Sequence, residues 1–207
     1  MIQFTRTILD NGLTVICNND KSTPFVSVNI LYKVGSRNEQ PEKTGFAHLF
    51  EHLMFGGSQH IPDYDLHVQA AGGDSNAYTT NDLTNYYITI PAANIETALW
   101  LESDRMAALN FSQHALDVQR QVVIEEFKQR YLNNPYGDLW LKLRPLAYKV
   151  HPYRWATIGI SPEHIERARL EDVEAFFHRY YAPDNAIIAI SGNIEENRAL
   201  ELGIKWF

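Results

Sequence analysis

The feature that most constrains this chain is a short segment that carries two histidines and a glutamate within five residues. His48, Glu51 and His52 are spaced i, i+3 and i+4, so on a helix their side chains share one face. Nearly all other positions of residues 44–57 are apolar or glycine, which predicts a helix buried almost all round. Two imidazoles and a carboxylate buried without compensation cost several kcal/mol, and a metal ion bound by the histidines removes that cost. We therefore expect a metal site here, with a further ligand elsewhere in the chain.

The composition restricts the class of partner. Of the 207 residues, 45% are hydrophobic and 21% charged, as in typical globular proteins. The formal net charge of −7 argues against nucleic acid or an anionic membrane as a partner. No apolar stretch reaches the roughly 20 residues that a membrane-spanning helix needs, and residues 1–6 lack the pattern of a signal peptide. We expect a cytoplasmic protein, or a periplasmic one if a signal peptide has been removed.

The alternation of strand-like and helix-like segments predicts an α+β fold with a mostly antiparallel sheet and helices packed on it. Asp10, Asn11 and Gly12 form a hairpin turn signal, and Thr44 is a residue type that caps helix starts. No repeat or linker interrupts the pattern, so we expect one domain over residues 1–207. The expected strands are residues 4–9, 13–17, 26–34, 76–80, 85–90 and 186–191. The expected helices are residues 45–55, 62–71, 93–109, 112–132, 138–150, 162–180 (in one or two pieces) and a last one up to residue 207.

The helix that begins after Ser112 offers two adjacent candidates for the missing ligand, Glu125 and Glu126. At 100° per residue, Glu126 falls in the middle of the apolar arc of this helix and Glu125 falls at its edge. A carboxylate on an apolar face needs a partner, which is a metal or, alternatively, a structural ion pair. Gln119 lies on the same face two turns earlier. The arc is made by Leu116, Val118, Val122, Val123 and Phe127.

Two histidines and a glutamate form a known catalytic zinc set that leaves a fourth position open for water. Glu51, held beside the metal but outside the ligand set, can accept a proton from that water and later donate it to a leaving amine. The residues therefore predict peptide-bond hydrolysis with one Zn²⁺ per chain and no covalent intermediate. A charged surface patch is the simplest alternative, and the apolar surroundings of this helix disfavour it.

Together these residues resemble the pitrilysin/insulinase family of zinc peptidases, the inverzincins, in which H-x-x-E-H reverses the commoner H-E-x-x-H. The chain is also similar to beta-type subunits of mitochondrial processing peptidase. The resemblance implies His48, His52 and Glu126 as zinc ligands, Glu51 as the base, and a metallohydrolase domain of the processing-peptidase/insulinase type. The segments that carry it are residues 10–15, 45–57, 73–79, 122–126, 151–153 and 181–186.

The resemblance also implies how substrate and partner meet the chain. Asn76, Ala77 and Tyr78 correspond to the strand along which these enzymes bind an extended peptide by strand addition. The active unit of the family is a clamshell of two related halves. We therefore expect an N-terminal peptidase domain that is closed by a second half-domain or a partner subunit. On its own it should bind zinc but cleave peptides poorly.

Gln119 departs from the family pattern and keeps an alternative open. Many active members carry a glutamate at this position, near the metal but not bound to it, and glutamine keeps a hydrogen bond while losing the charge. A non-catalytic, peptide-binding partner subunit of the same family is therefore the second interpretation. The S-ribosylhomocysteine lyase family also uses H-x-x-E-H. Its chemistry needs a cysteine downstream of the motif, whereas Cys17 lies upstream in an apolar run.

Overall fold

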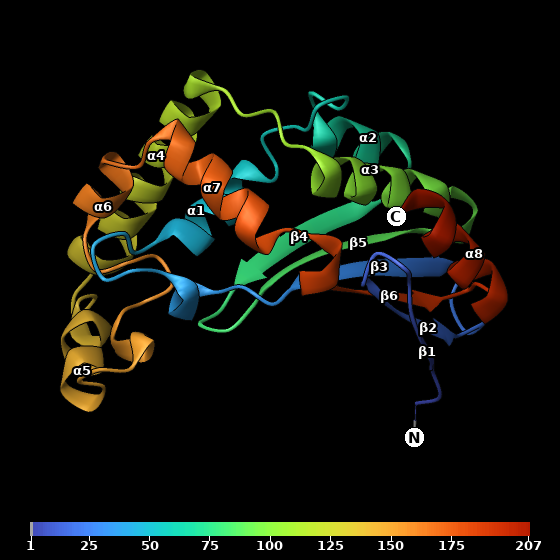
Figure 1. Cartoon of the computed structure of the whole chain (residues 1–207), viewed down its shortest axis with the longest axis horizontal. Helices are drawn as coiled ribbons and strands as arrows, with labels where there is room; N and C mark the ends of the chain where they lie inside the picture. Colours follow the sequence, from blue (N-terminus) through green and yellow to red (C-terminus); the bar gives the residue numbers. More distant parts are fainter. Residues whose placement is uncertain (1) are drawn as a thin grey trace.

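The computed structural model describes residues 2–207, and Met1 lies outside the described residues. Six strands form one sheet in the order β1-β2-β6-β3-β5-β4 (Figure 1). Neighbouring strands are antiparallel except β2 and β6, which run parallel. The expected α+β fold with a mostly antiparallel sheet is confirmed. The strands are β1 (Thr5–Ile8), β2 (Thr14–Asn19), β3 (Phe25–Tyr32), β4 (Asp74–Thr79), β5 (Thr84–Pro91) and β6 (Ala186–Gly192).

The helices lie close to their expected positions. The segment expected at residues 162–180 is divided into two helices, and a π-helical turn, η3, continues the long fourth helix. The helices are α1 (Phe46–Leu53), α2 (Tyr64–Ala70), α3 (Ile95–Ala107), α4 (Gln113–Phe127), η3 (Lys128–Leu132), α5 (Leu139–Ala147), α6 (Pro162–Glu166), α7 (Leu170–Tyr180) and α8 (Glu196–Trp206), with short 3-10 turns at η1 (Ser36–Asn38), η2 (Ala92–Asn94), η4 (Pro152–Arg154) and η5 (Pro183–Asn185).

The helices cover the face of the sheet that carries the buried apolar side chains. In β3, Val26, Val28 and Ile30 are fully buried, as the alternation predicts. One continuous buried cluster includes both Leu13 and Leu202, from opposite ends of the chain. Figure 1 shows α2, α3 and α8 over the sheet, with α1, α4 and α6 gathered at one end. Among residues 2–207, no helix is both long enough and apolar enough to span a membrane.

A buried ion pair fastens α3 to its neighbours. Arg105 donates two hydrogen bonds to Glu102, at 2.8 and 2.5 Å, and both side chains are almost completely buried. The guanidinium lies over the rings of Tyr86 and Tyr64, 4.4 and 4.6 Å from their centroids. Tyr64 also donates its hydroxyl to Glu102 at 2.7 Å. Such a pair tolerates burial only because hydrogen bonds and ring faces replace the lost water, so it fixes α3 against α2 and β5.

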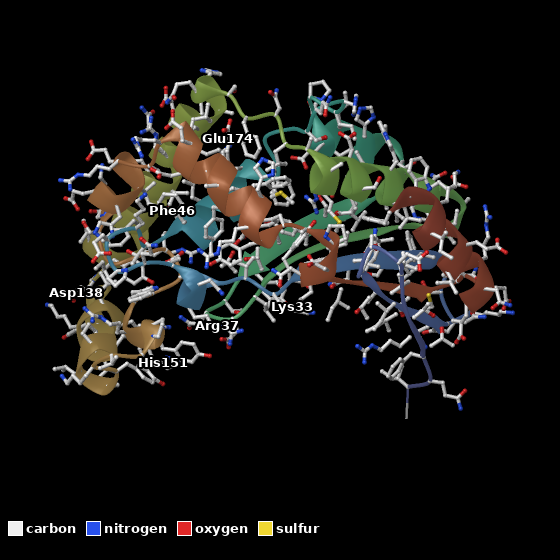
Figure 2. The ribbon with its side chains drawn as sticks, viewed as in Figure 1. Lys33, Arg37, Phe46, Asp138, His151 and Glu174 are labelled. Atoms are coloured by element: carbon white, nitrogen blue, oxygen red, sulfur yellow. The ribbon has the colours of Figure 1, made fainter. Side chains whose placement is uncertain are left out.

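A small unit that contains α5 and the residues that follow it projects from the rest of the molecule (Figure 1). Figure 2 places Asp138 and His151 in this unit, beyond the end of the sheet, while Phe46 lies at the start of α1. None of the residues of α5 is buried. The unit is tied to the rest by Arg144, whose Nη1 lies 3.3 Å from Asn81 Oδ1 in the β4–β5 turn.

Candidate metal centre

The helix that carries the two histidines begins differently from the sequence expectation. The helix starts at Phe46. The preceding residue, Gly45, has a φ of 91°, a backbone conformation that favours glycine. Thr44 makes no capping hydrogen bond. Instead, the Thr44 hydroxyl accepts a hydrogen bond from Ile160 N at 3.1 Å and lies 2.9 Å from His164 Nδ1. The prediction of Thr44 as the cap is therefore wrong, because the Thr44 hydroxyl contacts Ile160 and His164 instead.

The Glu39 side chain, and not Thr44, accepts hydrogen bonds from backbone N–H groups at the start of α1. Its Oε2 accepts from Gly45 N at 2.9 Å and its Oε1 accepts from Ala47 N at 2.8 Å. Burial raises the pKa of the Glu39 carboxyl to about 8, against the opposing effect of these N–H groups, which favour the ionised form. A buried side chain from a preceding loop thus holds the first turn of the helix that carries His48.

We expect Glu39→Ala to lower the free energy of unfolding by about 2 kcal/mol, because it leaves two buried backbone N–H groups without an acceptor. Glu39→Gln is the matched control: its amide oxygen retains one acceptor, so the loss should be clearly smaller. Urea unfolding of both variants measures the difference. Equal stability of Glu39→Ala and the unmodified chain would contradict this role.

Three side chains from α1 and α4 converge to form the candidate metal centre. His48 Nε2 and His52 Nε2 lie 3.5 and 3.3 Å from the same atom, Glu126 Oε2. The three candidate ligand atoms lie within 4.8 Å of one another. Zinc bonds of about 2.0–2.1 Å in a tetrahedron place neighbouring ligand atoms about 3.3–3.4 Å apart. The donor set fits zinc, and the distances from Glu126 Oε2 to the two histidine nitrogens are close to two edges of such a tetrahedron.

The protonation states of His48 and Glu126 suit a cation. Burial lowers the pKa of His48 to about 4, an effect that the carboxylate of Glu126 only partly opposes, so this imidazole is neutral at neutral pH. The hydrogen bond with His52 lowers the pKa of Glu126, which is therefore ionised. Metal ligation requires neutral imidazole and ionised carboxylate. His48 and Glu126 are therefore in the protonation states that bind metal.

The structure brings Glu126, and not Glu125, to the histidines. The side chain of Glu125 is 70% exposed and pairs with Lys128 at 2.6 Å. The expected arc around Glu126 is nevertheless wrong in part, since Val118 and Val122 are 43% and 45% exposed. The helix has two apolar rows, one against the core and one open to solvent, and Glu126 lies at the border between them. The core-facing row is Leu116, Val123 and Phe127.

Arg130 completes the surroundings of Glu126 and was not anticipated from the sequence. Its Nη2 lies 2.6 Å from Glu126 Oε1, which leaves Oε2 to face the two histidines. Arg130 belongs to the π-helical turn η3, a rare geometry that is often found at functional sites. The i+4 spacing from Glu126 was the one signal available in the sequence.

Glu51 stands on α1 beside the cluster but outside the group of three ligand atoms. Burial raises the pKa of the Glu51 carboxyl, and a hydrogen bond from Thr79 partly offsets this rise. Thr79 Oγ1 donates to Glu51 Oε2 at 2.5 Å. A carboxyl with a raised pKa near a metal centre is suited to accepting and returning a proton.

The structure places the remaining expected residues less closely. Gln119 is half-buried on α4 and makes no hydrogen bond to the cluster within residues 2–207. Asn76, Ala77 and Tyr78 lie in β4, an edge strand of the sheet, with Tyr78 48% exposed. Asn76 Oδ1 accepts from Ala77 N at 2.7 Å, so the side chain occupies a backbone donor of this strand.

Comparisons with known proteins identify relatives of this chain. A family profile described as insulinase (peptidase family M16) matches residues 14–140, and one described as peptidase M16 inactive domain matches residues 160–205. The zinc protease PqqE of Helicobacter pylori is 38% identical over 202 residues, which cover 96% of this chain and 45% of that protein. A probable mitochondrial-processing peptidase subunit beta of Arabidopsis thaliana is 25% identical over 204 residues, covering 97% and 38%.

A solved structure supports the same relationship. The crystal structure of a protease from Helicobacter pylori matches with a TM-score of 0.95 and 37% sequence identity. The match covers 100% of this chain and 50% of that one. The chain spans about half the length of the curated relatives it matches.

Proposed function

Because this chain belongs to the insulinase (M16) family of peptidases, we propose that it is a zinc-dependent endopeptidase domain that hydrolyses peptide bonds in extended peptides. The observation that carries the proposal is the convergence of His48 Nε2 and His52 Nε2 on Glu126 Oε2, at 3.5 and 3.3 Å. Each of these two distances is close to the edge length of a zinc tetrahedron. Relatives named as zinc proteases support the same chemistry.

Each residue of the site then has a defined task. His48, His52 and Glu126 would hold one zinc ion per chain, and Arg130 keeps Glu126 oriented through Oε1. When bound, zinc supplies a Lewis acid for the scissile carbonyl and lowers the pKa of water. Glu51 accepts the proton of the attacking water on its carboxylate and returns it to the leaving amine nitrogen.

We propose that the substrate binds along the open edge of β4. An extended peptide can add to an edge strand through main-chain hydrogen bonds, with side chains alternating above and below. The N–H of Ala77 is engaged by the Asn76 side chain. Asn76 must therefore turn away before a peptide carbonyl can accept that N–H. The Asn76 side chain thus occupies this one backbone donor of the edge strand.

The proposal includes a second half. The chain spans about half the length of its curated relatives, and we propose that residues 1–207 form one N-terminal domain that closes as a clamshell on a related half-domain or partner subunit. Closure would exclude water and complete the contacts to the peptide.

The test is cleavage of an extended peptide by the complete protein with its second half present. We expect a chelator to abolish cleavage, because the residues that hold zinc are the centre of the site, and added zinc to restore it. Cleavage that continues unchanged after the zinc has been removed would contradict the proposal.

A peptide-binding subunit without catalysis is the second candidate. Gln119 favours it, because a neutral amide stands where the family resemblance implies a carboxylate. Binding of peptide by the zinc-loaded complete protein without any cleavage would establish this candidate instead.

A further inference from the structure

The last residue of β4 makes a direct contact with the proposed base. Residues of β4 alternate, with Asn76 and Tyr78 exposed and Thr79 half-buried on the opposite face. Thr79 Oγ1 donates to Glu51 Oε2 at 2.5 Å. Within residues 2–207 the carboxylate of Glu51 receives no other hydrogen bond from a side chain or the backbone. This single contact therefore sets the rotation of the carboxylate and leaves Oε1 for a proton.

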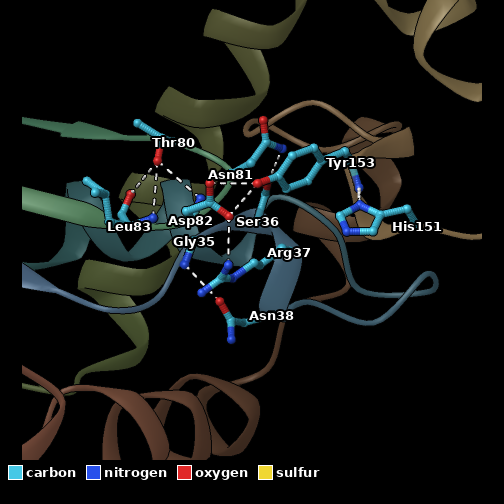
Figure 3. Close-up of polar contacts among 10 residues, drawn as sticks. All are labelled: Gly35, Ser36, Arg37, Asn38, Thr80, Asn81, Asp82, Leu83, His151 and Tyr153. Atoms are coloured by element: carbon cyan, nitrogen blue, oxygen red, sulfur yellow. Dashed lines mark hydrogen bonds and ion pairs between the residues drawn. The ribbon is translucent and has the colours of Figure 1, made fainter. Parts of the chain in front are cut away.

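The turn that follows Thr79 is closed on itself. Thr80 N donates to Leu83 O at 2.8 Å, and Thr80 Oγ1 accepts from the backbone N–H groups of Asp82 and Leu83, each at 3.1 Å (Figure 3). A threonine hydroxyl that accepts from the residues two and three positions later stabilises a tight turn. The end of β4 is thereby held in one conformation.

A separate segment, residues 35–38, holds this turn from the side. Ser36 N donates to Thr80 O at 3.2 Å, Arg37 N donates to Asn81 O at 2.9 Å, and Asn81 Nδ2 donates to Ser36 Oγ at 2.8 Å. The two backbones approach so closely that a Cβ on Gly35 would lie 2.6 Å from Thr80 O. Figure 3 shows the two segments side by side. Residues 35–38 therefore fix the position of the turn.

Asp82 and Ser36 connect this pair of segments to a third. Tyr153 donates its hydroxyl to the Asp82 carboxylate, 2.6 Å from each oxygen, and Arg37 Nη1 lies 3.0 Å from Asp82 Oδ1 (Figure 3). Trp155 Nε1 donates to the buried Ser36 carbonyl at 2.7 Å. Three stretches that are distant in sequence thus form one polar frame, defined here as residues 35–39, 80–83 and 153–155.

The frame also reaches the helix that carries Glu51. Glu39, the residue after the η1 turn, accepts the N–H groups of Gly45 and Ala47 at the start of α1. One segment therefore sets both the position of the β4 end, which carries Thr79, and the start of α1, which carries Glu51. The short hydrogen bond between the two side chains depends on both ends of this segment.

We propose that Thr79 is the positioning residue for Glu51 and that the polar frame holds Thr79 at the distance this task requires. The proposal rests on the proposed function, because positioning matters only if Glu51 transfers the proton. In this role Thr79 acts only through its hydrogen bond to Glu51. It acts by fixing which carboxylate oxygen is free.

The test compares Thr79→Val with Thr79→Ser in the complete, zinc-loaded protein. Valine keeps the branched shape of the strand residue and loses the donor, whereas serine keeps the hydroxyl. We expect Thr79→Val to lower kcat about 10- to 100-fold, the scale of a lost hydrogen bond to a charged group and a misplaced catalytic side chain. KM and zinc content should stay unchanged, and Thr79→Ser should retain most of kcat. Should Thr79→Val not fold, Thr79→Ala replaces it in the comparison.

A double variant separates positioning from a general structural effect. In a Glu51→Gln background there is no base left to position, so adding Thr79→Val should leave the residual rate unchanged. A kcat for Thr79→Val equal to that of the unmodified protein, or the same loss in both backgrounds, would overturn the proposal. If the unmodified protein holds no zinc or cleaves no peptide, it is the proposed function that fails.

Discussion

Replacing Glu51 by glutamine is expected to lower kcat of the complete protein about 1,000-fold while zinc remains bound. Glutamine has nearly the same shape and can still accept the hydrogen bond that Thr79 donates to Glu51. It cannot take up a proton, so the attacking water loses its base and the leaving amine loses its acid. General acid–base catalysis contributes about 10²- to 10⁴-fold in enzymes, which sets the scale of the loss.

The measurement is a peptide-cleavage assay combined with metal analysis of the same samples. Glu125→Gln is the matched control, because it removes a charge one residue from the cluster on a side chain that is 70% exposed. The control should cleave at close to the unmodified rate. A Glu51→Gln variant that keeps more than about a tenth of kcat would show that another group moves the proton.

Removing Glu126 is expected to weaken metal binding strongly. Glu126→Ala leaves His48 and His52 as the only ligands from this set, and the affinity for zinc should fall by well over the 10- to 100-fold that indirect contacts contribute. Glu125→Ala, its matched control, should bind zinc as tightly as the unmodified chain. Competition with a chromogenic chelator measures both affinities.

This comparison is sharp because the two glutamates are adjacent and differ only in helical phase. Glu126 lies 3.3–3.5 Å from both imidazoles, whereas Glu125 pairs with Lys128 in solvent. Equal zinc affinity for the two alanine variants would mean that α4 does not supply the third ligand. Loss of zinc in Glu125→Ala, but not in Glu126→Ala, would mean that Glu125 supplies the third ligand.

Local patterns in the sequence predicted those elements whose determinants are local. The turn at residues 10–12, the alternation of β3 and the apolar circumference of α1 each carry their own periodicity or turn chemistry, and each was found in place. The H-x-x-E-H spacing placed three candidate site residues on one face for the same reason. No sequence pattern predicted the parallel pairing of β2 and β6, strands from opposite ends of the chain.

The contacts around the site depended on tertiary structure and were missed or misassigned. Thr44 has the chemistry of a cap, yet the loop residue Glu39 performs that task because the fold carries it to the start of α1. The helical phase calculated from the sequence placed the core-facing and the solvent-facing apolar rows of α4 in one arc and did not distinguish them. Thr79 is 28 positions from Glu51, and only the packing of β4 beside α1 reveals that their side chains meet.

The zinc content of the purified, unmodified chain tests the central claim most directly. After loosely bound metal has been removed by dialysis, we expect one zinc ion per chain, lost when His48 and His52 are both replaced by alanine. A correctly folded chain without zinc, or one that keeps its zinc after both histidines are gone, would contradict the account.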